Sequence, residues 1–227
     1  MSKPAAYELS PVQLDGVVLA PPVGRPTNYT RSLFHVASGV FTLGLLRLLP
    51  GRAWLIAVAS VFFAAAWTME AARRRSPAVN ERLMRFFGPV AHPHERHRVN
   101  SSTWYVTALL LLSLVAPLHA AEIGIVVLAV ADPAAGLIGR RFGRTRLRAG
   151  RSLEGTLGFV AVGALAGLAL LAVFHGIPWP SRIVLALAGA VAGALAELSS
   201  TRLDDNFTIP LAAAAAAAGA QLFLPAI

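Results

Sequence analysis

Seven apolar runs constrain the fold of this chain more than any other feature of its sequence. They lie at residues 32–49, 53–72, 103–118, 123–139, 153–174, 183–198 and 207–224. A transmembrane helix needs about 17 to 25 apolar residues to cross a hydrocarbon core about 30 Å thick. The composition agrees, because 56% of the 227 residues are hydrophobic and 14% are charged, whereas soluble domains carry about a quarter charged residues. We therefore predict an all-α integral membrane protein with about seven transmembrane helices.

The positive charges are distributed unevenly about these runs. Of the 20 Lys and Arg residues, all but Arg47, Arg52 and Arg182 lie on one side of a seven-span topology. Since cytoplasmic loops are enriched in Lys and Arg, we place the N-terminus in the cytoplasm and the C-terminus outside. Arginines at a membrane surface usually contact anionic headgroups, and no aromatic-basic platform accompanies them here. The net charge of +9 therefore does not indicate a nucleic-acid partner.

Two further features of the composition bear on domain organisation and location. The chain has no cysteine, which excludes disulfides, thiolate metal sites and cysteine nucleophiles. Residues 1–30 are rich in proline, and their apolar stretch is too short for a signal peptide, so we predict a cytoplasmic tail followed by a single transmembrane domain over residues 31–227. The high Ala and Arg content suggests a GC-rich bacterial genome, and hence the bacterial plasma membrane.

An acidic residue lies deep within the fourth run. Asp132 follows Glu122 by ten residues, which places it roughly 15 Å into the membrane at 1.5 Å per residue. A carboxylate at that depth needs a partner, a cation or a water-filled cavity. The next residue, Pro133, lacks a backbone donor and fits the first turn of a new helix. We therefore predict that the fourth helix is broken near Asp132–Pro133 and that a functional site lies there.

A connection rich in glycine and arginine follows this carboxylate. Glycines let a backbone approach a ligand closely, and arginines bind phosphate oxygens. Ser152 is a good N-cap for the next helix, whose N-terminus favours anions, with Glu154 acting through a bridging divalent cation. Glu154 as a simple capping carboxylate on the helix dipole is the alternative. The predicted nucleotide-binding residues are Gly136, Gly139, Arg140, Gly143, Arg144, Arg151, Ser152 and Gly155.

A third polar motif, Asp204-Asp205-Asn206, precedes the last run. Two adjacent carboxylates at a membrane interface are also typical of a helix cap. These residues nevertheless lie on the same predicted side as Asp132 and Glu154, and Mg²⁺ is commonly held by a few carboxylates plus substrate phosphates. We therefore predict one phosphate site, with Asp132, Glu154 and Asp205 catalytic.

In this order the motifs resemble the family of CTP-dependent polyprenol and lipid kinases, which comprises dolichol kinase, phytol kinase and CTP-dependent diacylglycerol kinase. The resemblance rests on Asp132-Pro-Ala-Ala-x-x-x-Gly-Arg-x-x-Gly143, Arg151-Ser-Leu-Glu-Gly-Thr156, Asp204-Asp-Asn-Phe-Thr-Ile-Pro210 and the segment from Glu95 to Tyr105. It implies that a lipid hydroxyl receives the γ-phosphoryl group of CTP, the co-substrate. It also implies the metal ligands, namely that Mg²⁺ and the CTP phosphates are held by Asp132, Glu154, Asp204 and Asp205. Two positions depart from the family pattern: Arg151 stands where Lys is usual, and Ala131 where Gly is usual.

We expect the lipid partner on the same side of the membrane as the nucleotide. Arg31 and His35 share one helical face near the cytoplasmic surface and can reach a headgroup there. Spaced glycines and the alanine run of residues 212–218 predict tight helix packing, with a homo-oligomer as one version of it. The predicted acceptor or headgroup residues are Arg31, His35, Glu95, Arg98, Asn100, Tyr105, Glu197 and Asn206.

Three alternatives stay open at this point. A related enzyme would attack the α-phosphate of CTP and make a CDP-lipid, as a phosphatidate cytidylyltransferase does. A transporter would use Asp132 and Glu197 as an intramembrane relay. A metal site at His92, His94 and His97 is disfavoured, because Pro93 disrupts the helical spacing and no Cys or Asp completes a ligand set.

Overall fold

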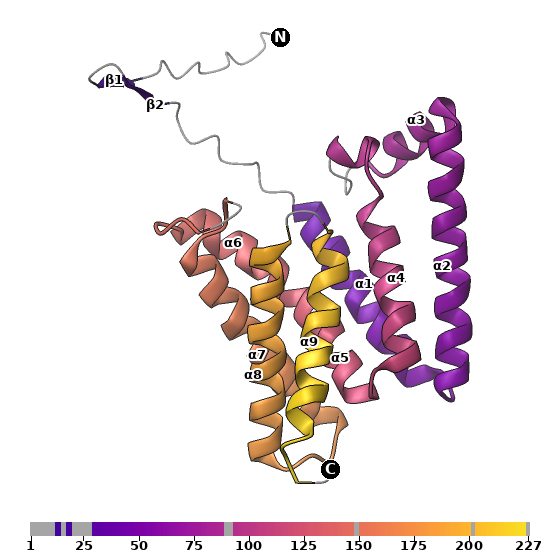
Figure 1. Ribbon diagram of the computed structural model, residues 1–227, viewed down its shortest axis with the longest axis vertical. Helices are drawn as coiled ribbons and strands as arrows, with labels where there is room; N and C mark the ends of the chain where they lie inside the picture. Colours follow the sequence, from indigo (N-terminus) through magenta and orange to yellow (C-terminus); the bar gives the residue numbers. More distant parts are fainter. Residues whose placement is uncertain are drawn as a thin grey trace, which may run out of the picture.

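The computed structural model describes most of the chain after its N-terminal segment. The described ranges are residues 12–14, 17–19, 29–88, 93–147, 150–200 and 203–225, with side chains from residue 29 onward except those of Pro93 and His94. A short antiparallel pair of strands, β1 (Val12–Leu14) and β2 (Val17–Leu19), precedes the helices. From residue 29 onward the described chain consists of helices and their connections (Figure 1).

A helix occurs at each of the seven apolar runs. These helices are α1 (Tyr29–Leu48), α2 (Arg52–Arg75), α4 (Ser101–Val115), α5 (Leu118–Val126) continued by η2 (Val127–Ala131) and α6 (Asp132–Phe142), α7 (Leu153–Phe174), α8 (Trp179–Ser199) and α9 (Asp205–Gln221). The short helices α3 (Pro77–Phe86) and η1 (Pro93–Arg96) connect α2 to α4. Within the described residues, α2, the combined helix 118–142, α7 and α8 are long and apolar enough to cross a membrane.

Three side-chain caps begin helices at one end of the bundle. Asn100 accepts a hydrogen bond from the backbone N–H of Ser102 (2.8 Å) and begins α4. Ser152 accepts one from Gly155 (3.1 Å) and begins α7, as its sequence position predicts. The Asp204 carboxylate accepts one from the N–H of Asn206 (3.0 Å) and begins α9. Each cap satisfies a backbone donor that the helix itself cannot pair.

The helices pack with very different tightness on the two sides of the bundle. The combined helix 118–142 lies in the middle, and 56% of its most apolar stretch is buried. Helices α7, α8 and α9 pack against it and against one another. On the other side α2 packs on α4 and is only 6% buried, while α1 packs on α5 and η2 (Figure 1). The groove described below lies between α1, α2 and α4, with residues of α5 and η2 also lining it.

The fourth helix is not broken at Asp132–Pro133. The backbone at Ala131 and Asp132 is right-handed helical, and the preceding residues Val127–Ala131 form a π-helical turn. Proline lacks a donor and its ring clashes with the carbonyl four residues before it. A π-turn widens the helix locally, so that it accommodates the proline without the predicted interruption.

Candidate active site

Arg151 lies at the centre of a cluster of carboxylates at the capped end of the bundle. Its guanidinium forms ion pairs with Glu197 on α8 (2.8 Å) and Asp205 on α9 (3.3 Å). Burial alone lowers the pKa of Arg151, but the charges of Glu197, Asp132 and Asp205 outweigh it and raise that pKa above its usual value. Three carboxylates from three helices therefore surround one arginine.

Asp132 and Asp205, which the sequence separates widely, lie on the same site. The charges of Asp205, His35, Arg151 and Arg31 all act on the Asp132 carboxylate. His35 Nε2 is 4.0 Å from Asp132 Oδ2. The Asp132 and Asp205 side chains are 22% and 28% exposed, so both are accessible to a ligand. Two like charges that face each other favour a bound cation between them.

The acidic segment before α9 is connected to the entrance of α4. Ser101 Oγ donates a hydrogen bond to Asp204 Oδ2 (2.9 Å) and is 3.4 Å from Glu95 Oε1. The buried Glu95 carboxylate also pairs with Arg31 (3.1 Å). Burial and the charge of Asp205 raise the pKa of Asp204, although hydrogen bonds from Asn206 and Ser101 act in the opposite direction. The predicted acceptor residues Arg31 and Glu95 therefore lie next to the predicted metal ligands.

Glu154 lies apart from the other predicted ligands and serves the preceding loop. Its carboxylate accepts hydrogen bonds from the backbone N–H of Thr145 at 3.2 and 3.3 Å, and its role as a metal ligand or as a capping carboxylate stays a prediction. Within the described residues, no group of three or more His, Asp and Glu side chains is placed to hold a metal ion. The charge of Asp205 acts on both Asp132 and Asp204 of the predicted set.

The predicted nucleotide-binding glycines have a packing role in the structure. A Cβ added to Gly139 would lie 2.9 Å from Ser152 Oγ, and one added to Gly155 would lie 2.9 Å from the carbonyl oxygen of Ala135. A Cβ at Gly143 would meet Ser152 as well. These glycines allow α6 and α7 to approach closely, as small residues do between membrane helices.

The arginines of this region are at the surface. The side chain of Arg140 lies over Gly136 on the same helix, and Arg140 and Arg144 are both exposed. They are accessible to phosphate oxygens near the N-terminus of α7, although no contact in the described chain joins them to the Arg151 cluster. Arg98 is also exposed, and its carbonyl accepts a hydrogen bond from Arg73.

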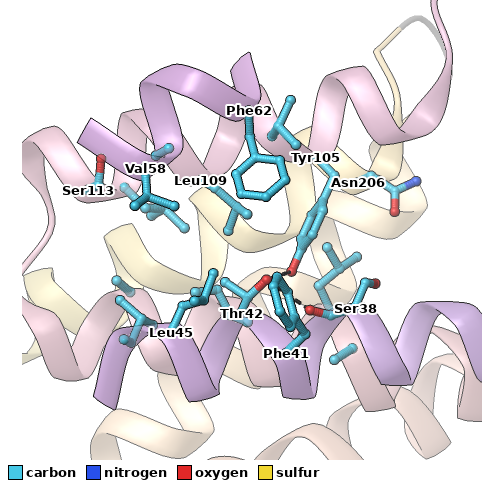
Figure 2. Close-up of a pocket in the computed structure, with 18 of the residues that line it drawn as sticks. Ser38, Phe41, Thr42, Leu45, Val58, Phe62, Tyr105, Leu109, Ser113 and Asn206 are labelled. Carbon is cyan, nitrogen blue, oxygen red and sulfur yellow. Dashed lines mark hydrogen bonds between the residues drawn. The ribbon is translucent and has the colours of Figure 1, made fainter. Parts of the chain in front are cut away.

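A groove of about 500 Å³ opens beside this polar cluster. Apolar side chains of α1, α2 and α4 line most of it, among them Leu45, Val58 and Leu109 (Figure 2). Six of the eight predicted acceptor residues line it too, whereas Arg98 and Glu197 do not. These six are Arg31, His35, Glu95, Asn100, Tyr105 and Asn206. Because His35 also faces Asp132, the groove and the carboxylate site share a residue.

One buried network near the site was not foreseen from the sequence. Glu70, only 2% exposed, pairs with Arg73 (2.7 Å) and Arg74 (2.6 Å) at the end of α2. The backbone N–H of Asn100 approaches Glu70 at 3.4 Å, and Arg73 donates to the side chain of Asn80 (3.0 Å). The network holds α2 to the entrance of α4. A glutamate three and four residues before arginines was its sequence signal.

The histidine-rich segment gives little support to the alternative metal site. His92 and the side chain of His94 lie outside the described residues, and His97 is exposed. In the part of the chain that is described, His97 belongs to no metal-binding group.

Comparison with known proteins gives a consistent picture. The chain is 34% identical to the phytol kinase of Synechocystis sp. over 210 residues, which cover 88% of this chain and 82% of that protein. The chain belongs to the CTP-dependent lipid kinase family. This lipid kinase is also 28% identical to the CTP-dependent diacylglycerol kinase 1 of Schizosaccharomyces pombe, over 81% of this chain and 89% of the relative, and 27% identical to the Saccharomyces cerevisiae protein of the same name. Neither a family model nor a solved structure matches the chain.

Family membership gives the arrangement a chemical meaning. The protein is a lipid kinase of the membrane with CTP as co-substrate. A kinase needs positively charged groups for the phosphates and a group that orients the acceptor hydroxyl. At the capped end of this lipid kinase, the arginines of the 140–146 segment are exposed, Arg151 lies among carboxylates, and Asp132 lies beside His35.

Proposed function

We propose that the lipid kinase transfers the γ-phosphoryl group of CTP to the hydroxyl of a lipid alcohol at the end of the bundle where Asp132, Arg151 and Asp205 meet. One observation carries the proposal. His35 lines the apolar groove, and its Nε2 is 4.0 Å from the Asp132 carboxylate. A lipid in the groove with its hydroxyl beside His35 therefore presents that hydroxyl to Asp132, the side chain that orients it and takes its proton.

The charge pattern supports a role for Mg²⁺ at this site. The charge of Asp205 acts on Asp132, and both side chains are partly exposed; a few carboxylates together with substrate phosphates suit this ion. In the proposal these two residues hold Mg²⁺, with Asp204 and Glu154 as the further predicted ligands. Bound Mg²⁺ neutralises the negative charge of the phosphates. Arg140, Arg144 and Arg151 of the chain itself bind the remaining phosphate oxygens.

The proposed orientation in the membrane rests on the arginines at the capped end of the bundle. The arginine-rich segments 73–102 and 140–152 both lie at the capped end, so by the positive-inside rule that end faces the cytoplasm, where CTP is found. In this proposal all seven long helical segments span the membrane. The groove, whose walls are α1, α2 and α4, then opens sideways to the lipids.

The test is transfer of label from CTP to lipid alcohols by the purified protein in detergent or lipid nanodiscs. With γ-labelled CTP and Mg²⁺ we expect label in the lipid, and we expect Asp132→Asn to lower the rate at least a hundredfold, which is in the range for removal of a positioned proton acceptor. Glu81→Gln is the matched control, because Glu81 is a 53% exposed carboxylate that pairs with Arg96 on the surface. It should leave the rate unchanged.

Two outcomes contradict the proposal. If label from the α-position enters the lipid and pyrophosphate is released, the enzyme makes a CDP-lipid. If CTP does not bind at all, the intramembrane relay of a transporter becomes the better explanation for Asp132.

A further inference from the structure

The basic segment between α2 and α4 lines a second pocket, of about 270 Å³, which is separate from the groove. Its lining includes four arginines together with Asn80 and His97, and the arginines are Arg73, Arg74, Arg96 and Arg98. In the described part of the chain no carboxylate lines this pocket, and none of its lining residues lines the groove. Arg98, a predicted headgroup residue that lies outside the groove, therefore belongs to another cavity.

The buried side chain of Arg73 holds one wall of this pocket in place. Arg73 is 7% exposed. Its guanidinium donates to Glu70 (2.7 Å) and to the backbone carbonyls of Arg96 (3.5 Å) and Arg98. The side chain of Asn80 on α3 donates to the same carbonyl of Arg96 (3.1 Å). The backbone that carries the last two arginines is thus fixed against α2 and α3, and such preorganisation lowers the cost of binding a ligand.

The pocket carries more positive than negative charge. Its two α2 arginines share a single carboxylate, that of Glu70, and Arg96 pairs with Glu81 (2.7 Å). No ion pair of the described residues involves Arg98. Four arginines and two glutamates leave two positive charges in excess. The 53% exposed Arg74 and the exposed Arg98 can both direct N–H donors at phosphate oxygens.

Two tryptophans indicate the depth of this pocket in the membrane. Trp67 on α2 and Trp104 on α4 pack edge to face, with 6.2 Å between their ring centroids. Tryptophan is enriched where the hydrocarbon core meets the headgroups. Arg73 follows Trp67 by six residues, about 9 Å along a helix at 1.5 Å per residue, and the headgroup layer is about 5 to 8 Å thick on each side of the core. The pocket therefore lies level with the lipid headgroups.

The short helix α3, which contributes Asn80 to the pocket, has the pattern of an interfacial helix. Val79, Leu83 and Phe86 share one of its faces, and Phe86 is 78% exposed. Arg85 lies on the other side of the helix and is 81% exposed. Helices of this kind lie in the plane of the headgroups with their apolar face towards the acyl chains. In Figure 1, α3 lies beside the end of α2 at the top of the bundle. This position favours a membrane lipid over a soluble compound as the ligand.

We propose that this pocket binds the phosphate group of an anionic phospholipid in the leaflet at the capped end. Arg74 on α2 and Arg98 before α4 contact the phosphate oxygens, while the acyl chains stay in the bilayer. Because α2 is only 6% buried, a phosphate held by both arginines adds a tie between α2 and the entrance of α4. The inference is independent of the proposed function, since the pocket lies outside both the groove and the Arg151 cluster.

Native mass spectrometry of the full chain in detergent measures this binding, with phosphatidylglycerol as the probe. The double variant Arg74→Gln/Arg98→Gln should weaken binding of the first lipid at least tenfold, because it removes two arginines that bind the phosphate. Glu70 keeps its pair with Arg73 in this variant, so the network that holds α2 remains.

The matched control is Arg82→Gln/Arg85→Gln, which removes the same charge from α3 at two residues that do not line the pocket. It should change the affinity by less than about twofold. An equal loss in both double variants would reduce the binding to a general attraction between arginines and anionic lipid, and would overturn the inference. Phosphatidylcholine bound as tightly as phosphatidylglycerol would do the same. Displacement of the lipid by inorganic pyrophosphate would assign the pocket to a soluble phosphate compound instead.

Thermal unfolding in nanodiscs tests the tie between α2 and α4. A ligand that binds only the folded chain raises its stability. Phosphatidylglycerol added to phosphatidylcholine nanodiscs should raise the unfolding midpoint of the native chain and of the α3 control, and the rise should be lost in Arg74→Gln/Arg98→Gln. A rise of equal size in all three proteins contradicts the inference. Neither measurement includes CTP or a lipid alcohol, so the outcome here and the outcome for phosphoryl transfer are separate.

Discussion

Both ends of the helical bundle contain a buried glutamate paired with an arginine, but only at the capped end do further carboxylates surround the pair. At the capped end Arg151 binds Glu197, and their side chains are 31% and 3% exposed. At the opposite end Arg47 binds Glu122, with side chains 31% and 1% exposed. Burial and chemistry are thus closely matched. The two pairs differ in what surrounds them.

The opposite end is balanced in charge. Glu122 Oε1 forms an ion pair with Arg47, and Glu122 Oε2 is 2.5 Å from His175 Nε2. Arg47 also packs over the ring of Phe174, 4.4 Å from its centroid. The cluster thus joins α1, α5 and the end of α7, and both oxygens of the Glu122 carboxylate have a partner within it. Such a cluster fastens helices together, and it provides no charge for a ligand.

The capped end is unbalanced. Glu197, Asp205 and Asp132 share Arg151, and the neighbouring arginine, Arg31, pairs with Glu95. An excess of carboxylates is costly in a membrane protein unless a cation or a ligand neutralises it. The comparison teaches that a buried ion pair alone does not mark an active site. Unpaired charge beside an accessible groove is the more informative feature.

Removal of each arginine should give the largest effect and should separate the two ends. Arg151→Ala and Arg47→Ala each remove the arginine partner of a buried glutamate, and breaking a buried pair in this way typically costs about 3–5 kcal/mol of stability. Both should therefore lower the free energy of unfolding to a similar extent. Arg151→Ala should in addition abolish phosphoryl transfer, whereas Arg47→Ala, assayed per folded molecule at low temperature, should retain it. Denaturant unfolding in nanodiscs and initial rates measure the two effects.

This comparison fails if Arg47→Ala loses transfer to the same degree as Arg151→Ala at equal folded fraction. The opposite end would then contribute to the reaction as well as to stability.

A smaller effect distinguishes glycines that pack from glycines that only connect. Gly139→Ala places a Cβ 2.9 Å from Ser152 Oγ, the group that caps α7. We expect a loss of about 1–3 kcal/mol, as for other overpacked sites. Gly176→Ala at the opposite end is the matched control: no neighbouring atom lies within 4 Å of its added Cβ, so it should change stability by less than about 0.5 kcal/mol. Equal effects in unfolding experiments would show that the α6–α7 contact is not tightly packed.

Much of this arrangement was predictable from the sequence, because membrane helices leave strong local signals. The apolar runs predicted where helices occur, and Ser152 predicted a cap that the structure confirms. The charges of Asp132, Arg151 and Asp205 act on one another, whereas the predicted roles of these residues in binding and catalysis stay predictions. In a membrane each buried charge must find a partner, so a pattern of charges along the chain carries information about the tertiary structure.

Other features depend on geometry that a linear pattern does not contain. The sequence predicted a break at Pro133, but a π-helical turn accommodates the proline. It did not predict that Gly139 and Gly155 lie at a close approach of α6 and α7, and their role in nucleotide binding stays a prediction. The groove could not be foreseen, since it arises from the different partners of α1 and α2. Helix spacing depends on side chains from several segments at once.

The smallest expected effect concerns the hydrogen bond between Tyr105 on α4 and Thr42 on α1, which joins two walls of the groove. Tyr105→Phe removes the hydroxyl that donates to Thr42, while the Thr42 hydroxyl keeps its hydrogen bond to Ser38. No buried donor is left unpaired by the change, so the cost should be about 0.5–1.5 kcal/mol, as for one ordinary hydrogen bond. Because Tyr105 lines the groove and belongs to neither charged cluster, KM for the lipid should rise a few-fold with kcat unchanged. Tyr29→Phe, at a tyrosine 69% exposed, should alter neither constant. A hundredfold fall in kcat for Tyr105→Phe would mean that the groove wall takes part in the chemistry, and that the division between a reactive end and a lipid-holding wall is incorrect.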